Sequence, residues 1–320
     1  MNAQAHRVVV LTGGTGGAKL VRGLERALGG DALTAIVNTG DDLNWWGLHV
    51  SPDIDSVTYA LADLLSRERG WGVEGDTFQC LERMRRLGAP SWFQLGDRDL
   101  ALHLTRTQLL REGQTLTEAT DAIARAFGIR AHMLPMSDEA VETRVLTAEG
   151  EVGFQEYFVR ERFKPEVKSV RFVGVANAKP APGLLEGISS ASAIVVAPSN
   201  PITSIGPILA VPGIREALQK TEAPVIAVSP IVGGAAVSGP AGNLMKAAGL
   251  PVSIEGIARA YSDFLDVLVA DSADSGIRMQ DPDVDLLFTN TIMRTDDDKL
   301  RLAQFILDAA AIARGKVAVG

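Results

Sequence analysis

The sequence predicts an α/β fold, in which a doubly wound, Rossmann-like and mostly parallel sheet carries a smaller inserted α+β subdomain. Short runs rich in β-branched residues recur along the 320 residues, and most are continuously apolar, as strands buried on both faces are. Helical patterns separate these runs, and a glycine-rich turn joins the first run to the first helical pattern. The predicted strands cover residues 8–11, 34–37, 170–175, 193–197, 224–228, 267–270 and 286–289.

The turn after the first predicted strand contains Gly13, Gly14, Thr15, Gly16, Gly17 and Lys19. Such a turn suits a phosphate, because glycine lets the backbone approach closely and the helix N-terminus offers unpaired N–H groups. It is not a Walker A loop, since Leu20 follows the lysine. In the dinucleotide motif Lys19 would take the third small position, where we expect it to block close helix–strand packing while reaching a phosphate. We expect this turn to bind phosphate; a tight turn without a ligand is the alternative.

Acidic residues follow the second predicted strand, in the segment Asn38-Thr39-Gly40-Asp41-Asp42. In open α/β sheets, ligands bind beyond the carboxyl ends of the strands. We therefore expect Asp41 and Asp42 to hold a ribose hydroxyl or a metal ion. A solvated turn is the alternative, since Asn, Gly and Asp all favour turns.

A second pair of acids, Asp53 and Asp55, follows Ser51 and Pro52 at the start of a helical pattern. A serine N-cap, a proline at the first helical position and acids in the first turn are also typical of an ordinary helix start. Yet four carboxylates near a phosphate-binding turn would repel an anionic ligand unless a cation lay between them, and magnesium prefers oxygen ligands. The sequence leaves helix capping and a magnesium or substrate role open for both acids.

Two further side chains are candidates for ligand binding. Trp46 follows another tryptophan between the two acidic segments, where an indole can stack on a flat heterocycle or pack beneath the loop. Arg98 lies between Asp97 and Asp99, and it either binds a phosphate or pairs with one of these acids. Taken alone, this segment favours the ion pair.

The loop after the predicted strand 193–197 is rich in hydroxyl and amide groups and is stiffened by prolines. Because the loop follows a strand, it is well placed to read a base or a sugar. An ordinary strand–helix loop is the alternative. The residues expected to bind the ligand here are Ser199, Asn200, Thr203 and Ser204.

The middle of the chain has a different pattern. Residues 66–130 have a helical and strongly charged pattern, and residues 131–160 resemble short alternating strands, such as 142–146 and 152–158. We therefore expect an inserted α+β subdomain at residues 66–165, and a core that binds nucleotide and substrate at residues 1–65 and 166–320. A last helix is predicted over residues 297–314, with an apolar stripe that faces the core.

Composition excludes several classes of function. The net charge of −8 disfavours a nucleic-acid partner. The single cysteine, Cys80, cannot support an internal disulfide framework and fits the reducing cytoplasm. No apolar stretch approaches about 18 residues, so we expect no membrane span. The sequence contains neither a His-Glu-x-x-His zinc motif nor a Gly-x-Ser-x-Gly nucleophile elbow.

Taken together, the motifs resemble the 2-phospho-L-lactate transferase family of coenzyme F-420 biosynthesis, in which they occur in the same order. The resemblance covers about residues 8 to 275, and the final part of the chain adds little. The combination is much more specific than the first turn alone. The segments that carry it are residues 13–19, 38–42, 51–55, 95–100, 134–138, 154–157, 198–207 and 229–234.

The resemblance implies a reaction. Family members transfer a phospho-acid from a guanosine diphosphate conjugate to the terminal ribityl hydroxyl of Fo, a deazaflavin (7,8-didemethyl-8-hydroxy-5-deazariboflavin). GMP leaves, and coenzyme F-420-0 or its dehydro form results. The family uses magnesium and often forms homodimers. Whether the acid is lactyl, enolpyruvyl or glyceryl stays open.

The resemblance also implies roles for the candidate residues. Asp41, Asp53 and Asp55 are expected to carry magnesium, and one of them to orient or deprotonate the attacking hydroxyl. The glycine-rich turn and Lys19 are expected to hold the diphosphate. Arg98 is expected to offset developing charge or to hold Fo, and the loop after the strand 193–197 to read guanine and ribose.

Two alternatives belong to other classes of protein. A non-catalytic regulator of the gluconeogenesis-factor type shares the first glycine-rich turn and the acidic end of the second strand, and binds nucleotide sugars. Residues 95–100, 154–157 and 198–207 match the transferases better. A nicotinamide dehydrogenase would fit the Rossmann-like start, but Lys19 and the lack of a catalytic His/Lys arrangement argue against it.

Overall fold

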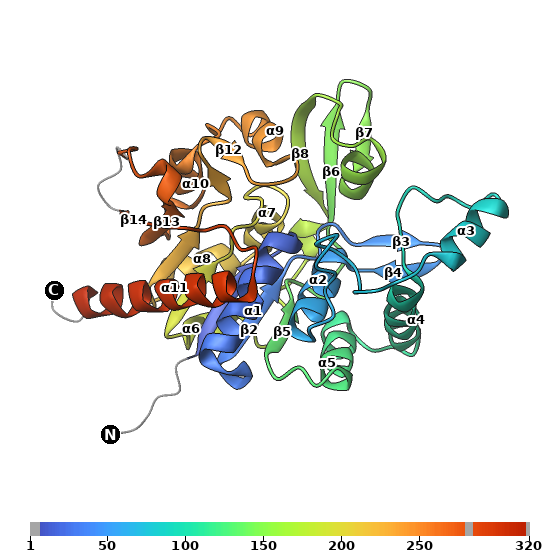
Figure 1. Cartoon of the computed structure of the whole chain (residues 1–320), viewed down its shortest axis with the longest axis horizontal. Helices are drawn as coiled ribbons and strands as arrows, with labels where there is room; N and C mark the ends of the chain where they lie inside the picture. The colour runs from blue at the N-terminus through green and yellow to red at the C-terminus, as the bar shows by residue number, and fades with distance from the viewer. Residues whose placement is uncertain (1–6, 279–283, 318–320) are drawn as a thin grey trace.

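The computed structural model describes residues 7–278 and 284–317. A seven-stranded parallel sheet runs through it in the order β14-β13-β10-β9-β1-β2-β5 (Figure 1). The predicted α/β, Rossmann-like fold is confirmed. The strands of this sheet are β1 (Val8–Thr12), β2 (Leu33–Val37), β5 (His132–Pro135), β9 (Ala193–Val196), β10 (Val225–Val228), β13 (Val267–Asp271) and β14 (Asp285–Thr289).

Apolar side chains alternate between the two faces of the sheet, because successive residues of a strand point to opposite sides. In β1, Val8 and Val10 pack on one face and Val9 and Leu11 on the other. The first face is covered by α1 (Gly14–Leu28), α2 (Pro52–Leu61), α5 (Leu116–Ala126) and α11 (Asp296–Val317). The second is covered by α6 (Leu184–Ser189), α7 (Ile205–Ala210), α8 (Ile214–Lys220), α9 (Ala241–Ala247) and α10 (Ile254–Tyr261).

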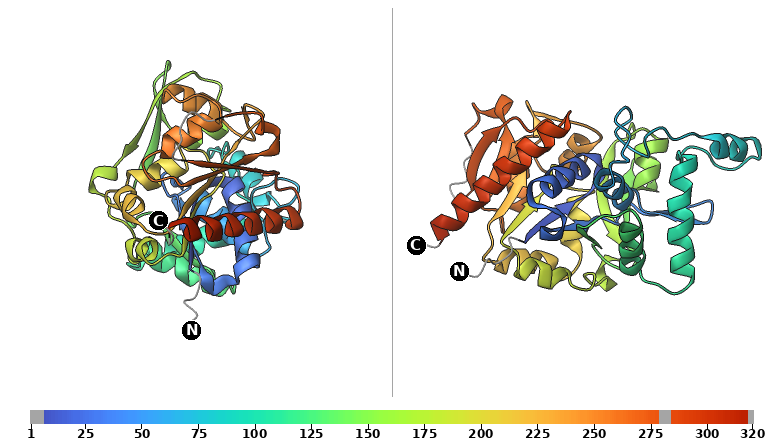
Figure 2. Two further views of the ribbon diagram at one scale, coloured as in Figure 1. Left: turned by 90° about the vertical axis from the view of Figure 1, so that its left-hand side faces the viewer. Right: turned by 60° about the horizontal axis from the view of Figure 1, so that its bottom comes forward.

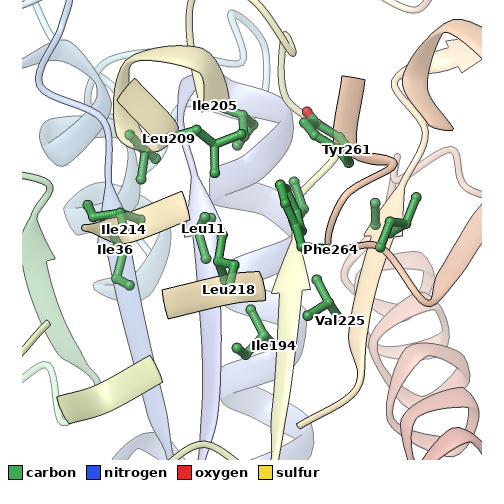
Figure 3. Packing of buried hydrophobic residues seen from close by; sticks show 14 of the residues in the cluster. Leu11, Ile36, Ile194, Ile205, Leu209, Ile214, Leu218, Val225, Tyr261 and Phe264 are labelled. Atoms are coloured by element: carbon green, nitrogen blue, oxygen red, sulfur yellow. The ribbon is translucent and has the colours of Figure 1, made fainter. Parts of the chain in front are cut away.

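Figure 3 shows the core of the second face, where Leu11, Ile36 and Ile194 of the strands meet the apolar side chains of α7 and α8. All three strand residues are fully buried. Continuous burial on both faces explains why these strands read as unbroken apolar runs in the sequence.

The remaining elements lie outside the main sheet. Figure 2 shows α3 and α4 on the side of the molecule far from α11. A second, antiparallel sheet has the order β7-β6-β8. The elements are the hairpin β3 (Leu43–Trp45) and β4 (Leu48–Val50), α3 (Gln79–Arg86), α4 (Asp97–Arg111), β6 (Glu142–Thr147), β7 (Glu151–Gly153), β8 (Val167–Val173), the hairpin β11 (Ile231–Val232) and β12 (Ala235–Ala236), and the short helical turns η1 (Gly30–Ala32), η2 (Glu156–Arg160), η3 (Val175–Asn177) and η4 (Ser272–Asp274).

Two strand predictions were wrong in part, the first in the sheet that the strand joins and the second in the length of the strand. The run at 170–175 does not join the parallel sheet: it lies largely in β8, which pairs antiparallel with β6 and is half exposed. The run at 152–158 is a strand only as far as Gly153, and the π-helical turn η2 then follows. Both runs are apolar for local reasons, since β8 and η2 pack around the small cluster of Val145, Tyr157 and Leu244.

The edge strand β5 joins the main sheet from within the segment assigned to the insertion. His132 pairs with Thr34 of β2, and Leu134 pairs with Ile36. The division into a core at residues 1–65 and 166–320 and an insertion at residues 66–165 stays a prediction. Its bounds place β5 in the insertion, although β5 belongs to the main sheet, and β8 in the core, although β8 pairs with β6 of the insertion. A short strand was expected within residues 131–160, but β5 is too short for its pattern to indicate that it joins the main sheet.

The predicted last helix is confirmed as α11, which lies alongside α1 (Figure 1). Gly23 allows this packing, because a Cβ there would lie 2.3 Å from the Lys299 carbonyl oxygen. Leu302, Ile306 and Ala310 form its buried stripe. Within the described ranges, none of the helices has both the length and the apolar character needed to cross a bilayer.

Candidate active site

The candidate site lies at the carboxyl ends of β1, β2 and β9. From β1 the chain turns to α1 on one face of the sheet, whereas from β9 it turns to α7 on the other. A crevice at such a reversal is where open α/β sheets bind their ligands. Ser199 joins the loop after β9 to the turn after β1, since its hydroxyl donates to the Gly13 carbonyl (2.6 Å) and accepts from the Gly13 N–H (3.3 Å).

The N-terminus of α1 points at an acid instead of at solvent. The Gly14 N–H donates to Asp53 Oδ1 at 2.6 Å. Gly13 makes this approach possible, because a Cβ on it would lie 2.5 Å from Asp53 Oδ2 and 2.8 Å from the Ser204 Cβ. Gly14 adopts a φ of 67°, a conformation that favours glycine. Both glycines are therefore required where the sequence predicted a phosphate-binding turn.

The expectation that Lys19 would block packing of α1 on the sheet was wrong. Gly17 provides the close approach, since a Cβ there would lie 2.1 Å from Thr12 Oγ1 and 2.6 Å from Ser199 Oγ. Lys19 lies two residues further on, and thus on a different face of the helix. It is half-buried, and burial together with the nearby Lys299 lowers its pKa.

Asn38 organises two of the predicted acids. Its amide group lies 2.9 Å from Asp41 Oδ1, 2.9 Å from Asp53 Oδ2 and 3.3 Å from the Thr203 carbonyl oxygen. The side-chain oxygen of Asn38 accepts the Gly40 N–H at 2.8 Å. From the other side, Gln155 donates to Asp41 Oδ2 at 2.8 Å. The structure thus brings Asp41 and Asp53 together at the N-terminus of α1.

Both of these acids are held in an environment that favours their neutral forms. Burial raises the pKa of Asp41 well above its usual range, and the charges of Asp53 and Asp42 add to the effect. Burial likewise raises the pKa of Asp53 to about 6, against the hydrogen bonds from Asn38 and Gly14. Buried carboxylates that repel each other are typical of sites that take up a proton or a cation.

Asp42 has partners of its own. His49 Nε2 lies 2.9 Å from Asp42 Oδ2, and the Ser51 hydroxyl donates to the same oxygen. Burial raises the pKa of Asp42, although the contacts with His49 and Ser51 oppose this. Ser51 is thus the N-cap residue of α2 by position, but its hydroxyl serves Asp42 and not the helix.

Asp55 takes no part in the Asn38 contacts that join Asp41 and Asp53, although it is only two residues from Asp53. Positions i and i+2 of a helix point in different directions. Asp55 consequently faces α4, where Arg106 binds both of its oxygens and His103 Nδ1 lies 3.6 Å from Oδ2.

Two of the three predicted magnesium ligands are therefore adjacent. Among the residues that the structure describes, no group of three or more His, Cys, Asp or Glu side chains is arranged to hold a metal ion. The oxygen donors of Asp41 and Asp53, with raised pKa values caused first by burial, are chemically suited to a hard divalent cation. Magnesium stays a prediction, and of its three predicted ligands Asp41 and Asp53 are the two that lie together.

The comparison with known proteins decides the family. The family model for "2-phospho-L-lactate transferase CofD" matches residues 8–302. The chain belongs to this family. It is 45% identical over 306 residues to the 2-phospho-L-lactate transferase of Methanocaldococcus jannaschii, covering 94% of this chain and 97% of that protein. With its relative from Methanosarcina mazei, which carries the same name, it shares 47% identity over 267 residues, 83% of this chain and 88% of that protein.

Two further similarities matter. The chain is 46% identical over 276 residues to the phosphoenolpyruvate transferase of Streptomyces griseus, covering 84% of this chain and 87% of that protein. Its fold is similar to the crystal structure of a UPF0052-family protein from Bacillus halodurans, with a TM-score of 0.65 at 20% sequence identity. That match covers 94% of this chain and 99% of the other, and it shows the fold alone. By its family, the chain is a transferase, and the resemblance inferred from its motifs is confirmed.

In this transferase, Arg98 is exposed on the first turn of α4, and its guanidinium donates to the Glu74 carbonyl at 2.8 Å. The alternative ion pairs are not formed, because Asp97 accepts N–H groups of α3 and Asp99 faces His103. A role for Arg98 toward the substrate stays a prediction.

Trp46 lies at the tip of the hairpin β3–β4 with a φ of 55°, and its indole N–H donates to the Pro90 carbonyl at 2.9 Å. Its ring is 5.7 Å from that of Trp45, which is buried against Trp92. The indole thus packs over a local aromatic cluster, which is the packing role that the sequence left open beside stacking. Stacking on a heterocycle stays a prediction.

In the loop after β9, Asn200 has a structural role, because its side-chain oxygen accepts the N–H groups of Ile202 and Thr203 at 2.9 and 3.4 Å. This places the Thr203 carbonyl against Asn38. Ser204 lies beside the α1 N-terminus, with its Oγ 3.9 Å from where a Gly14 Cβ would stand.

Sequence reasoning missed three side chains of the site, which are those of Thr12, Gln155 and Arg106. Among the described residues, the buried hydroxyl of Thr12 has no hydrogen-bond partner, and neither has that of Thr203. Unpaired buried hydroxyls at a glycine-rich turn suit the oxygens of a ligand. Gln155 was quoted within a motif but given no role, and Arg106 carried no signal. The fold reveals Thr12 through its proximity to Gly17, and Gln155 through its hydrogen bond to Asp41.

Proposed function

We propose that the chain transfers a phospho-acid, 2-phospho-L-lactate or its enolpyruvyl or glyceryl equivalent, from a guanosine diphosphate conjugate to the terminal ribityl hydroxyl of Fo. GMP leaves, and coenzyme F-420-0 or its dehydro form results. The family supports the transferase class. The observation that carries the finer proposal is the Asp53 carboxylate, held beside Asp41 at the N-terminus of α1 with a pKa raised to about 6 by burial.

The diphosphate of the donor suits the first turn of α1. The first N–H groups of a helix have no partner within it, and the positive end of the helix dipole favours anions. The Gly14 N–H is taken by Asp53, so Thr15, Gly16 and Gly17 would offer theirs to the phosphates. The loop that holds Ser199 and Ser204 would then border the guanosine.

The transfer itself needs a base for the attacking hydroxyl. As the ribityl oxygen forms its bond to the phosphorus nearest the acid, its proton passes to the Asp53 carboxylate, and the phosphorus–oxygen bond to GMP breaks. Phosphoryl transfer depends mainly on positioning and on compensating charge. When bound, magnesium would be held by Asp41, beside the Asp53 base, and would neutralise charge on the phosphates. Asn38 and Gln155 keep both carboxylates in place.

Turnover with defined donors tests this proposal. The relatives are named for two acids, 2-phospho-L-lactate in the proteins of Methanosarcina mazei and Methanocaldococcus jannaschii and phosphoenolpyruvate in that of Streptomyces griseus. The purified chain is mixed with Fo, magnesium and one of the three guanosine diphosphate conjugates, and GMP and the phosphodiester are followed by mass spectrometry. We expect product from at least one donor, and the fastest donor names the acid. Binding of Fo without product from any donor would contradict the proposal.

The pH dependence of the transfer follows from Asp53. A base must be ionised to accept the proton, and burial raises the pKa of Asp53 from 3.8 to about 6. We therefore expect kcat/KM to fall about tenfold per pH unit below a midpoint near that value. Unfolding monitored by circular dichroism over the same range excludes acid denaturation. A kcat/KM that stays constant down to about pH 4.5, below which an ordinary aspartate would protonate, would contradict the role of Asp53.

We further propose that the enzyme acts in the cytoplasm as a homodimer, as the resemblance to its family implied. Light scattering would give twice the chain mass of 33.9 kDa for a dimer. A mass of one chain at assay concentrations would contradict it.

A further inference from the structure

Arg106 is the largest fully buried side chain of the described residues, and it lies outside every motif that pointed to the function. It comes from the third turn of α4 and binds both oxygens of Asp55 on α2. Burial opposes its charge, but Asp55 outweighs this and raises the pKa of Arg106. The residue is therefore a permanent cation enclosed among the acids of the site.

Stability alone is a poor reason for this ion pair. Removing two charges from water costs several kcal/mol per ion, and a well-packed apolar pair of similar volume is often as stable or more stable. Arg106 adds to the cost, because its Nε is buried without a hydrogen-bond partner. What the ion pair provides, and an apolar pair does not, is a fixed direction.

The direction of the Asp55–Arg106 ion pair matters because Asp55 is close to Asp53 on α2. Asp55 and Asp53 share the first turn of α2. Asp53 reaches toward α1, where it accepts the Gly14 N–H, while Asp55 reaches toward α4. The first turn of α2 is thus held on both sides by directional contacts, and any rotation of the turn that loosened Asp55 would also move Asp53.

The same side of α4 also carries Asp99 and is linked through His49 to Asp42. Asp99, His103 and Arg106 follow helical spacing and are all buried. His103 lies between the carboxylates of Asp99 and Asp55. Its Nε2 is 3.2 Å from Asp99 and its Nδ1 is 3.6 Å from Asp55. One residue further on, Thr107 accepts the His49 backbone N–H at 2.8 Å, and His49 in turn contacts Asp42.

We propose that Arg106 is a positioning residue of the transfer reaction, which holds the first turn of α2 through Asp55 and thereby fixes the Asp53 carboxylate at the N-terminus of α1. Arg106 acts through Asp55 and does not touch the substrate. Asp55 is accordingly a part of this support, in place of the metal-binding role expected from the sequence. The inference rests on the proposed role of Asp53 as the base.

Two variants separate positioning from mere support of the fold. Arg106→Lys keeps the charge but loses the two-point contact with Asp55. We expect kcat to fall about 100-fold with the donor KM changed less than about threefold, because a small displacement of a reacting group is that costly. The double variant Asp55→Leu/Arg106→Met replaces the pair by apolar side chains. It should unfold cooperatively at the wild-type temperature or above, with kcat still about 100-fold low.

Arg259→Lys is the matched control, since Arg259 forms an exposed i,i+4 ion pair with Glu255 at 2.7 Å on α10, and its kcat should not change. Recovery of kcat to within about threefold of wild type in the double variant would overturn the proposal, because the pair would then only fill space.

Hydrogen exchange at the Gly14 amide gives a readout that needs no turnover. The Gly14 N–H is protected by Asp53, so Arg106→Lys should speed its exchange at least about tenfold while amides of the central strands stay protected. Unchanged exchange at Gly14 would overturn the proposal. Absence of transfer by the wild-type chain would instead count against the proposed function, and exchange at Gly14 would decide the positioning role separately.

Discussion

Replacing Asp53 with Asn is expected to lower kcat about 1,000-fold, the loss typical of removing a positioned general base. The substitution keeps the shape of the side chain and an oxygen that can still accept the Gly14 N–H. It removes the group that receives the proton of the attacking hydroxyl. The measurement is initial-rate kinetics with Fo and the preferred donor.

The stability of Asp53→Asn separates catalysis from folding. Burial raises the folded-state pKa of Asp53 to about 6, above its ordinary value of 3.8. Since the folded-state pKa is the higher one, the stabilisation that this group provides is present in acid and lost as the pH rises through about 6. At neutral pH the charge therefore opposes folding. Its removal offsets the hydrogen bond from Asn38 that the new NH2 group cannot accept, so the variant should melt close to the wild-type temperature.

Asp31→Asn is a suitable control for this substitution, because Asp31 is an exposed acid paired with Arg130 at 3.1 Å and lies before β2, at the opposite end of that strand from the site. It should keep full activity. An Asp53→Asn enzyme that retained kcat within about tenfold of wild type would rule out Asp53 as the base.

The second large effect is expected for Gly13→Ala. The new Cβ would lie 2.5 Å from Asp53 Oδ2, 2.8 Å from the Ser204 Cβ and 3.2 Å from the Asn38 Cβ. These are side chains of the site, so the clash must displace the base or the loop after β9. We expect kcat/KM to fall about 100-fold or more, and the free energy of unfolding to fall by about 1–3 kcal/mol.

Gly187→Ala provides the same chemical change where there is room. Gly187 lies in α6, and nothing stands within 4 Å of its Cβ position. Because alanine favours helix, this control should be as stable as wild type or more stable by up to about 1 kcal/mol. Chemical denaturation and steady-state kinetics on both variants make the comparison. Near-normal kcat/KM in Gly13→Ala would show that the turn does not have to approach the acids so closely.

The sequence was sufficient for the fold where burial was complete. The strands β1, β2, β9, β10 and β13 are apolar on both faces and flanked by helices, so composition alone revealed them. The prediction of strands failed for β8, whose apolar side chains pack on the small cluster around Tyr157 and not on the main sheet. It also failed for β5, which is too short to show a pattern. Pairing partners decide such cases, and a single sequence does not contain them.

The candidate site was predictable to the extent that it is local in the chain. Asp41, Asp53 and the glycines of the first turn follow strands or start helices, and the rule that ligands lie at strand ends brought them together correctly. The direction of Asp55 was not foreseen, although the i,i+2 spacing from Asp53 could have indicated it. Gln155 is 114 residues from Asp41 and Arg106 is 51 residues from Asp55, so only the tertiary fold reveals either contact.

In the proposed reaction, the ribityl hydroxyl of Fo attacks the phosphorus nearest the acid, at the N-terminus of α1. A donor with a radioactive label at that phosphorus tests this attack. We expect the label to appear in the phosphodiester formed with Fo, in amounts equal to the GMP released, and Asp53→Asn to form neither at an appreciable rate. Label recovered in the free phospho-acid, with GMP joined to Fo, would mean that the other phosphorus is attacked and that the proposed reaction is wrong.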